Sequence, residues 1–83
     1  MRTSRLTVLI GRTLRQQREL RGLTQHALAR LAGTDRSTVT RIEQGERAPT
    51  VAMLEKLLAA LDLQLTVGVE PLRRWRARHA RAD

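Results

Sequence analysis

The side chains best suited to contacting another molecule lie near the middle of this chain, in the segment RSTVTRIEQ. Val39 and Ile42 stand three residues apart, so a helix formed here would turn both toward the core. The opposite face would carry hydroxyl groups, an amide and arginines, contributed by Arg36, Ser37, Thr40, Arg41 and Gln44. Short hydroxyls let a helix sit deep in a groove, and one arginine can bond both O6 and N7 of guanine. The pattern favours a surface that recognises base edges in DNA over an ordinary solvated polar face.

Two flanking side chains are suited to phosphate. Gln25 begins the preceding predicted helix, where its amide adjoins free backbone N–H groups. Arg47 lies in the loop after the segment and could reach the DNA backbone on the other side. Such contacts orient a protein on DNA without choosing a sequence. Because the N-terminal end of a groove-binding helix points at the bases, Arg36, Ser37 and Arg41 are the strongest candidates for base contacts.

Four helices are predicted to position these side chains, over residues 7–21, 25–32, 36–44 and 51–61. Polar residues that cap a helix start precede the last three, namely Thr24, Asp35 and Thr50. Glycines suited to a left-handed cap end the first three: Gly22, Gly33 and Gly45. Residues 24–44 therefore form a helix–turn–helix unit.

Apolar residues at helical spacing predict an aliphatic core, since Trp75 is the only aromatic residue. The predicted core positions are Leu6, Ile10 and Leu14 in the first helix, Leu28, Ala29 and Leu31 in the second, and Met53 or Leu54 with Leu57, Leu58 and Leu61 in the fourth.

A change of period follows the fourth helix. From residue 61 to 69 apolar and polar residues alternate, and the alternation predicts a half-buried β-strand with Leu63, Leu65 and Val67 on its apolar face. A strand needs a partner for its backbone groups. The alternating residues 6–10 could supply one, or the same strand of a second subunit could do so. The second arrangement is favoured because Leu6 and Ile10 are already explained by a helix.

The last segment, residues 70–83, is a basic tail with five arginines. It is expected to be either a short helix or a solvated tail. Trp75 lies within it, and a lone tryptophan could anchor a protein partner or pack against the chain's own strand.

Composition limits the possible functions. The chain has 83 residues and a formal net charge of +8, and arginine supplies all but one of its 16 basic residues. One domain, residues 7–69, and a polyanionic partner are expected. There is no cysteine, and two isolated histidines do not make a metal site, so neither a metal nor a cofactor is expected. No catalytic constellation is present, and an enzyme is not expected. No apolar run is long enough for a signal peptide or membrane span, which predicts a cytoplasmic, nucleoid-associated protein with no membrane partner.

The motifs together resemble a known family. The run GLTQ, the following LA, the stretch GTDRSTVTRIEQG and the PT before a leucine-rich helix are similar to the Cro/C1-type (XRE) helix-turn-helix proteins. The resemblance covers residues 10–63 and implies a mainly α, lambda-repressor-like domain. That family usually has five helices; here a strand at 61–69 would replace the fifth. The segment ALDLQLTV resembles the HipB-type antitoxin of toxin–antitoxin modules, in which such a strand pairs across a dimer.

The resemblance also implies roles for individual residues. Base contacts fall on Arg36, Ser37, Thr40 and Arg41. Phosphate contacts fall on Thr24, Gln25, Gln44 and Arg47. A buried ion pair between the first and third helices falls on Arg18 and Glu43.

The sequence therefore predicts a homodimeric repressor that binds a palindromic operator in double-stranded DNA, as the autorepressing antitoxin of a HipBA-type module with a kinase-like toxin partner. Two alternatives remain. One is a stand-alone phage- or host-type repressor, and the other is a protein that neutralises a partner while DNA binding is secondary.

Overall fold

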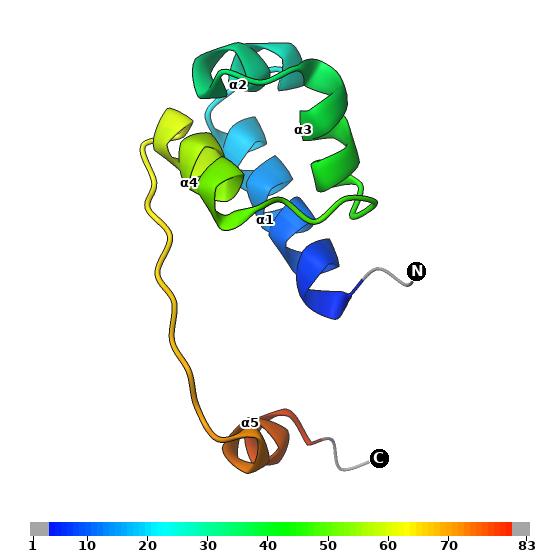
Figure 1. The fold of residues 1–83 in the computed structure, drawn as a ribbon, viewed down its shortest axis with the longest axis vertical. Helices are drawn as coiled ribbons and strands as arrows, with labels where there is room; N and C mark the ends of the chain where they lie inside the picture. The colour runs from blue at the N-terminus through cyan, green and yellow to red at the C-terminus, as the bar shows by residue number, and fades with distance from the viewer. Residues whose placement is uncertain (1–3, 81–83) are drawn as a thin grey trace.

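The computed structural model describes residues 4–80, and α-helices cover most of them (Figure 1). The helices are α1 (Arg5–Leu20), α2 (Gln25–Ala32), α3 (Arg36–Glu43), α4 (Val51–Ala60) and α5 (Leu72–His79). The first four lie within two residues of their predicted bounds at each end. We call residues 5–61 the four-helix body and residues 63–79 the C-terminal arm.

Polar caps start the helices of the four-helix body. Each capping side chain accepts a hydrogen bond from the backbone N–H three residues later, and the caps are Ser4, Thr24, Asp35 and Thr50. These bonds satisfy N–H groups that have no partner inside a helix. The last three caps are those predicted from the sequence.

The core lies between α1, α2, α3 and α4, with α3 packed on both α1 and α2, and α2 also packed on α4. The largest side chains with less than 2% exposure are Leu14, Leu28, Val39, Ile42, Leu57 and Leu61. Leu54 and Leu58 are also buried, so the core face predicted for the fourth helix is confirmed.

The prediction of a core position is wrong for two residues, because Leu6 is 65% exposed and Leu31 is 62% exposed. In α1 the buried positions are Thr7, Gly11 and Leu14, a stripe rotated by roughly a quarter turn from Leu6. In α2 the buried positions are Leu28, Ala29 and Ala32, which leaves Leu31 beyond the edge of the face.

Gly11 explains the rotation of α1. A Cβ atom at this position would lie 2.2 Å from the carbonyl oxygen of Ile42 and 2.9 Å from that of Glu43. The two helix backbones therefore approach so closely that only glycine fits between them. This contact turns the Gly11 side of α1, rather than the Leu6 side, toward α3.

The predicted strand at 61–69 is wrong for the described residues. Leu61 is the C-terminal cap of α4, and Asp62 adopts the left-handed conformation with φ 60°. The N–H groups of Asp62 and Leu63 bond the carbonyls of Ala59 and Leu58, which is a Schellman helix end. The alternation thus begins inside a helix cap.

Residues 63–71 follow as extended chain without regular secondary structure (Figure 1). Leu63 and Leu65 pack partly against the core, but Val67 and Val69 are 80% and 97% exposed. The internal partner considered for the strand, residues 6–10, lies within α1 and has its backbone bonds in the helix. No partner backbone is thus available within the described chain.

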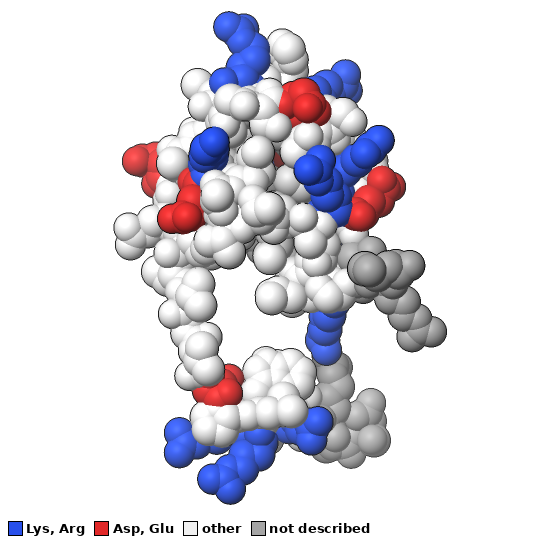
Figure 2. All heavy atoms as spheres, viewed as in Figure 1, with Lys and Arg blue, Asp and Glu red and all other residues white. Residues whose placement is uncertain are grey.

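The basic tail contains a helix, α5, which stands apart from the four-helix body (Figure 1). None of its residues is buried, and Arg78 pairs with Glu70 just before it. Figure 2 shows its basic side chains turned away from the body. Across the described residues, no helix combines the length and apolarity needed to span a membrane.

Candidate nucleic-acid interface

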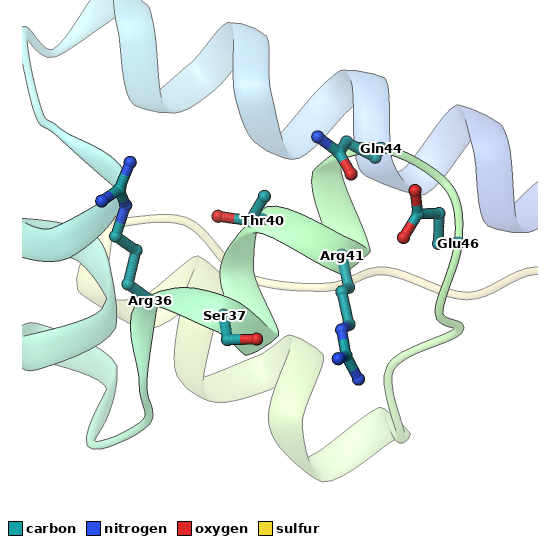
Figure 3. A pocket seen from close by; sticks show the side chains of 6 residues that line it. All are labelled: Arg36, Ser37, Thr40, Arg41, Gln44 and Glu46. Atoms are coloured by element: carbon teal, nitrogen blue, oxygen red, sulfur yellow. The ribbon is translucent and has the colours of Figure 1, made fainter.

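The outward face of α3 carries the predicted base-contacting side chains. Arg36, Ser37 and Arg41 are exposed, and Thr40 is half-buried. Figure 3 shows them along one side of the helix, where with Gln44 and Glu46 they line a shallow open hollow. Val39 and Ile42, with no exposure, hold the other side of α3 against the core. The structure therefore brings the candidate base contacts together on one accessible surface.

A buried ion pair holds α3 to α1. Arg18 Nε lies 2.7 Å from Glu43 Oε2, and Arg18 Nη2 lies 3.0 Å from Glu43 Oε1. The arginine side chain is 11% exposed and the glutamate 2%. Hydrogen bonding to the Glu43 carboxylate raises the pKa of Arg18 above its usual value. A forked, desolvated pair of this kind sets the distance and angle between the two helices.

Arg18 also reaches the turn before α2, where its Nη1 donates to the Leu23 carbonyl over 2.6 Å. The guanidinium of Arg18, a residue of α1, thus contacts both the α1–α2 turn and α3. Arg18 and Glu43 together form the structural centre of the helix–turn–helix unit.

Gln25 and Thr40 extend this network toward the surface. Gln25 Nε2 donates to Glu43 Oε1 at 3.0 Å, and Thr40 Oγ1 donates to Gln25 Oε1 at 2.9 Å. A side chain predicted to contact phosphate is therefore bonded directly to one predicted to contact a base. The sequence did not indicate this bond, because the two residues are 15 positions apart.

The remaining predicted phosphate contacts lie around the same face. Thr24 caps α2 by accepting a bond from Ala27 N–H, which leaves its hydroxyl proton free to donate. Gln44 is exposed at the C-terminal cap of α3. Arg47 is exposed in the following loop and donates to Thr38 Oγ1 at 3.4 Å. All three have O–H or N–H groups that could donate a hydrogen bond to a phosphate oxygen.

Asp35 places a negative charge at the start of α3. Its carboxylate accepts a hydrogen bond from Thr38 N–H over 2.7 Å, and this bond lowers the pKa of Asp35, with Arg47 and Arg41 adding smaller effects. The carboxylate stabilises the N-terminus of α3 but would repel a nearby phosphate. The interface therefore contains one residue that serves the helix at the expense of DNA affinity.

Gly11 is the structural residue that sequence analysis missed. It lies in α1 seven positions before Arg18, so the two share one face, and its contact with the α3 backbone sets how close α3 lies. A glycine inside an otherwise regular helical pattern was the available signal, because such a residue usually has a packing reason.

The C-terminal arm contributes nothing to this face. Leu63 and Leu65 lie partly against the core, whereas Val67 is exposed. Trp75, 37% exposed, stacks on His79 of the same helix with ring centroids 4.4 Å apart. Among residues 4–80, no three His, Cys, Asp or Glu side chains lie together as a metal site would need.

The fold and this site define a helix-turn-helix protein. Comparison with known proteins agrees: residues 14–67 match the family model described as helix-turn-helix. The chain belongs to this family, the Cro/C1-type (XRE) helix-turn-helix proteins.

Several relatives share the domain. An uncharacterized HTH-type transcriptional regulator of Haemophilus influenzae is 36% identical over 73 residues, which are 88% of this chain and 72% of that protein. The Escherichia coli HTH-type transcriptional regulator SutR is 32% identical over 66 residues, 80% of this chain and 37% of SutR. The chain thus spans about a third of the length of SutR.

Solved structures share the fold. The restriction-modification controller protein C.AhdI of Aeromonas hydrophila aligns with TM-score 0.68 and 41% identity, over 70% of this chain and 84% of that one. The controller protein C.Esp1396I, solved as a tetramer with its natural 35 base-pair operator, aligns with TM-score 0.71 and 28% identity, over 74% and 80% of the two chains.

Proposed function

We propose that this chain is a sequence-specific DNA-binding transcriptional regulator that binds a palindromic operator as a homodimer. The observation that carries the proposal is the outward face of α3, where Arg36, Ser37 and Arg41 are exposed together on a helix held by the Arg18–Glu43 pair. Relatives that share the domain are named transcriptional regulators, and one structural neighbour is described with its operator.

The mechanism follows from the geometry of the duplex. Two copies related by a twofold axis would present their α3 helices to successive major grooves, about 34 Å apart. Arg36, Ser37, Thr40 and Arg41 would contact bases, while Thr24, Gln25, Gln44 and Arg47 would contact phosphates. Occupation of a promoter by the dimer would then repress transcription, most simply of its own operon.

DNA selection from a random library tests this proposal directly. We expect a palindromic motif with half-sites about one helical turn apart. With about four phosphate contacts per subunit, the logarithm of the binding constant should fall with log salt at a slope of roughly −7. Tight binding without any motif would show that α3 does not recognise sequence, and the proposal would be wrong.

A second candidate function is the neutralisation of a protein partner, in the finer form of a HipB-type antitoxin that binds a kinase-like toxin. The observation in its favour is α5 of the C-terminal arm, which carries an exposed Trp75 beside arginines and stands apart from the four-helix body (Figure 1). A stand-alone repressor would need no such surface. Removal of residues 71–83 should leave operator binding intact and abolish partner binding; loss of operator binding instead would assign the arm to the DNA-binding function.

A further inference from the structure

Two hydrogen bonds link Thr40 to Gln25 and Gln25 to Glu43. Which group donates in each of them is determined by Glu43. Both oxygens of the Glu43 carboxylate accept hydrogen bonds from the Arg18 guanidinium, which can only donate, so these oxygens act as acceptors. The group of Gln25 that lies 3.0 Å from Glu43 Oε1 must therefore be the amide nitrogen. Gln25 cannot turn its amide over without placing its oxygen against the carboxylate.

The orientation of Gln25 determines what Thr40 can do. With its nitrogen toward Glu43, Gln25 presents its oxygen to Thr40 across 2.9 Å, and an amide oxygen only accepts. The single hydroxyl proton of Thr40 is then committed to Gln25. What remains of the Thr40 hydroxyl on the groove side is its lone pairs, so Thr40 can accept a hydrogen bond there but cannot donate one.

We infer that Thr40 is a specificity-determining residue that selects a base with an amino group, adenine or cytosine, over one with a keto group, guanine or thymine. The inference rests on the proposed function and refines it. In the major groove, adenine N6 and cytosine N4 donate, whereas guanine O6 and thymine O4 accept. A hydroxyl restricted to accepting meets a donor with a hydrogen bond and meets a keto oxygen with two facing lone pairs. The second N–H of Gln25 stays available for a phosphate, so both roles are compatible.

We call the hydrogen bonds from Thr40 to Gln25 and from Gln25 to Glu43 the relay. Base selection with purified variants of the whole chain tests it. Thr40→Val keeps nearly the same side-chain shape and removes the hydroxyl. The operator position that Thr40 contacts is the one at which this variant no longer prefers any base. At that position we expect the wild-type protein to favour adenine or cytosine by about three- to tenfold, the effect of one neutral hydrogen bond. Thr40→Ser keeps the accepting oxygen and should keep the preference.

Gln25→Met separates the relay from a simple contact. It removes the acceptor that holds the Thr40 proton, so the hydroxyl becomes free to donate and the preference for amino bases should fall below about twofold. Arg47→Gln is the matched control, because it also removes a proposed phosphate contact but lies outside the relay. It should weaken binding to all sequences and leave the preference unchanged. Circular dichroism of each variant checks that the fold is retained.

The outcomes are distinct. Loss of the preference in Gln25→Met with retention in Thr40→Ser and Arg47→Gln supports the inference. Selection of guanine or thymine at the Thr40 position, or an unchanged preference in Gln25→Met, overturns it while leaving the proposed function in place. Failure to select any motif overturns the proposed function, and this inference with it.

Discussion

The four-helix body contains the arginine–glutamate ion pair Arg18–Glu43, and the C-terminal arm contains the pair Arg78–Glu70. The two pairs differ in how far they are buried and in how many other groups they bond. Arg18 and Glu43 are 11% and 2% exposed and share a network with the α1–α2 turn and α2. Arg78 and Glu70 are 56% and 35% exposed, and within residues 4–80 their side chains bond only each other. The residue types are the same; what differs is that the first pair has lost its water and the second has not. Ion pairs therefore contribute here according to burial and connection rather than according to charge.

The apolar side chains differ in the same way. Leucines from different helices of the four-helix body converge on one core, whereas beyond Leu65 the apolar side chains of the arm stay exposed: Val67, Val69 and Leu72. A helix can bury its apolar face against its neighbours in one chain, but the described chain offers the part of the extended segment after Leu65 no second layer to pack on. The stability of the molecule therefore comes mainly from the packing of α1–α4.

The largest expected effect is that of Arg18→Met. Removal of the guanidinium leaves the Glu43 carboxylate buried without its charge partner, at a cost of about 3–5 kcal/mol in unfolding free energy. The matched control in the arm is Arg78→Met, where an exposed pair is lost and the change should stay below about 0.5 kcal/mol. Urea denaturation of both variants measures the difference. Equal effects would refute the contrast between the two pairs.

Gly11→Ala should follow, with a loss of about 3 kcal/mol. The added methyl would meet the α3 backbone at Ile42, which cannot move aside as a flexible side chain could. Gly68→Ala is the control in the arm, because a Cβ there would meet no atom within 4 Å. A thermal melt of the control should match that of the wild type. If Gly11→Ala were equally stable, α1 and α3 would not pack as closely as the structure shows.

Substitutions on the outward face of α3 and in the loop after it should act on DNA binding and leave folding unchanged. Arg41→Ala is expected to weaken operator binding by about 1–3 kcal/mol and to relax the preference at one position of each half-site. Arg47→Ala should weaken binding to all sequences and reduce the salt slope by about one. Titrations at several salt concentrations distinguish the two. In the arm, Arg74→Ala should leave the selected sequence unaltered; a changed motif would place α5 in the base-contacting surface.

Trp75→Ala should change the unfolding free energy by less than about 0.5 kcal/mol, although tryptophan is the largest side chain in the molecule. Its ring contacts His79 of the same short helix and no residue of the core. Chemical denaturation at two protein concentrations measures this. A loss above about 1 kcal/mol that grows with protein concentration would show that the arm packs on a second copy.

The smallest effect is expected from Asp35→Asn, which keeps the cap and removes its charge. The pKa of Asp35 is lowered in the folded state, so its charge stabilises the fold above the pKa of the unfolded chain, and that contribution disappears as the pH falls below about 4. The difference in melting temperature between wild type and variant should therefore shrink on acidification. At neutral pH the variant should bind DNA more tightly in low salt, because a charge that repels phosphate is gone. Weaker binding would mean that Asp35 contributes to DNA contact.

The sequence by itself determined the helices of the four-helix body. Caps such as Thr24 and Asp35 and glycines such as Gly22 act within one helical turn, so their effect is local and can be recognised in the letters. The inward orientation of Val39 and Ile42 also followed from spacing alone. These are properties of a helix that do not depend on where its neighbours lie.

Only the tertiary structure decided which face of α1 is buried, because that depends on the approach of α3 at Gly11. It also decided the fate of residues 61–69, where alternation predicted a strand but strand formation depends on a partner that the described chain does not supply. The hydrogen bond between Gln25 and Thr40 also depends on the tertiary structure, because it joins residues of two different helices. Local chemistry acts over a few bonds and can be predicted from neighbours in sequence, whereas packing, pairing and hydrogen-bond direction depend on groups that meet only after the chain has folded.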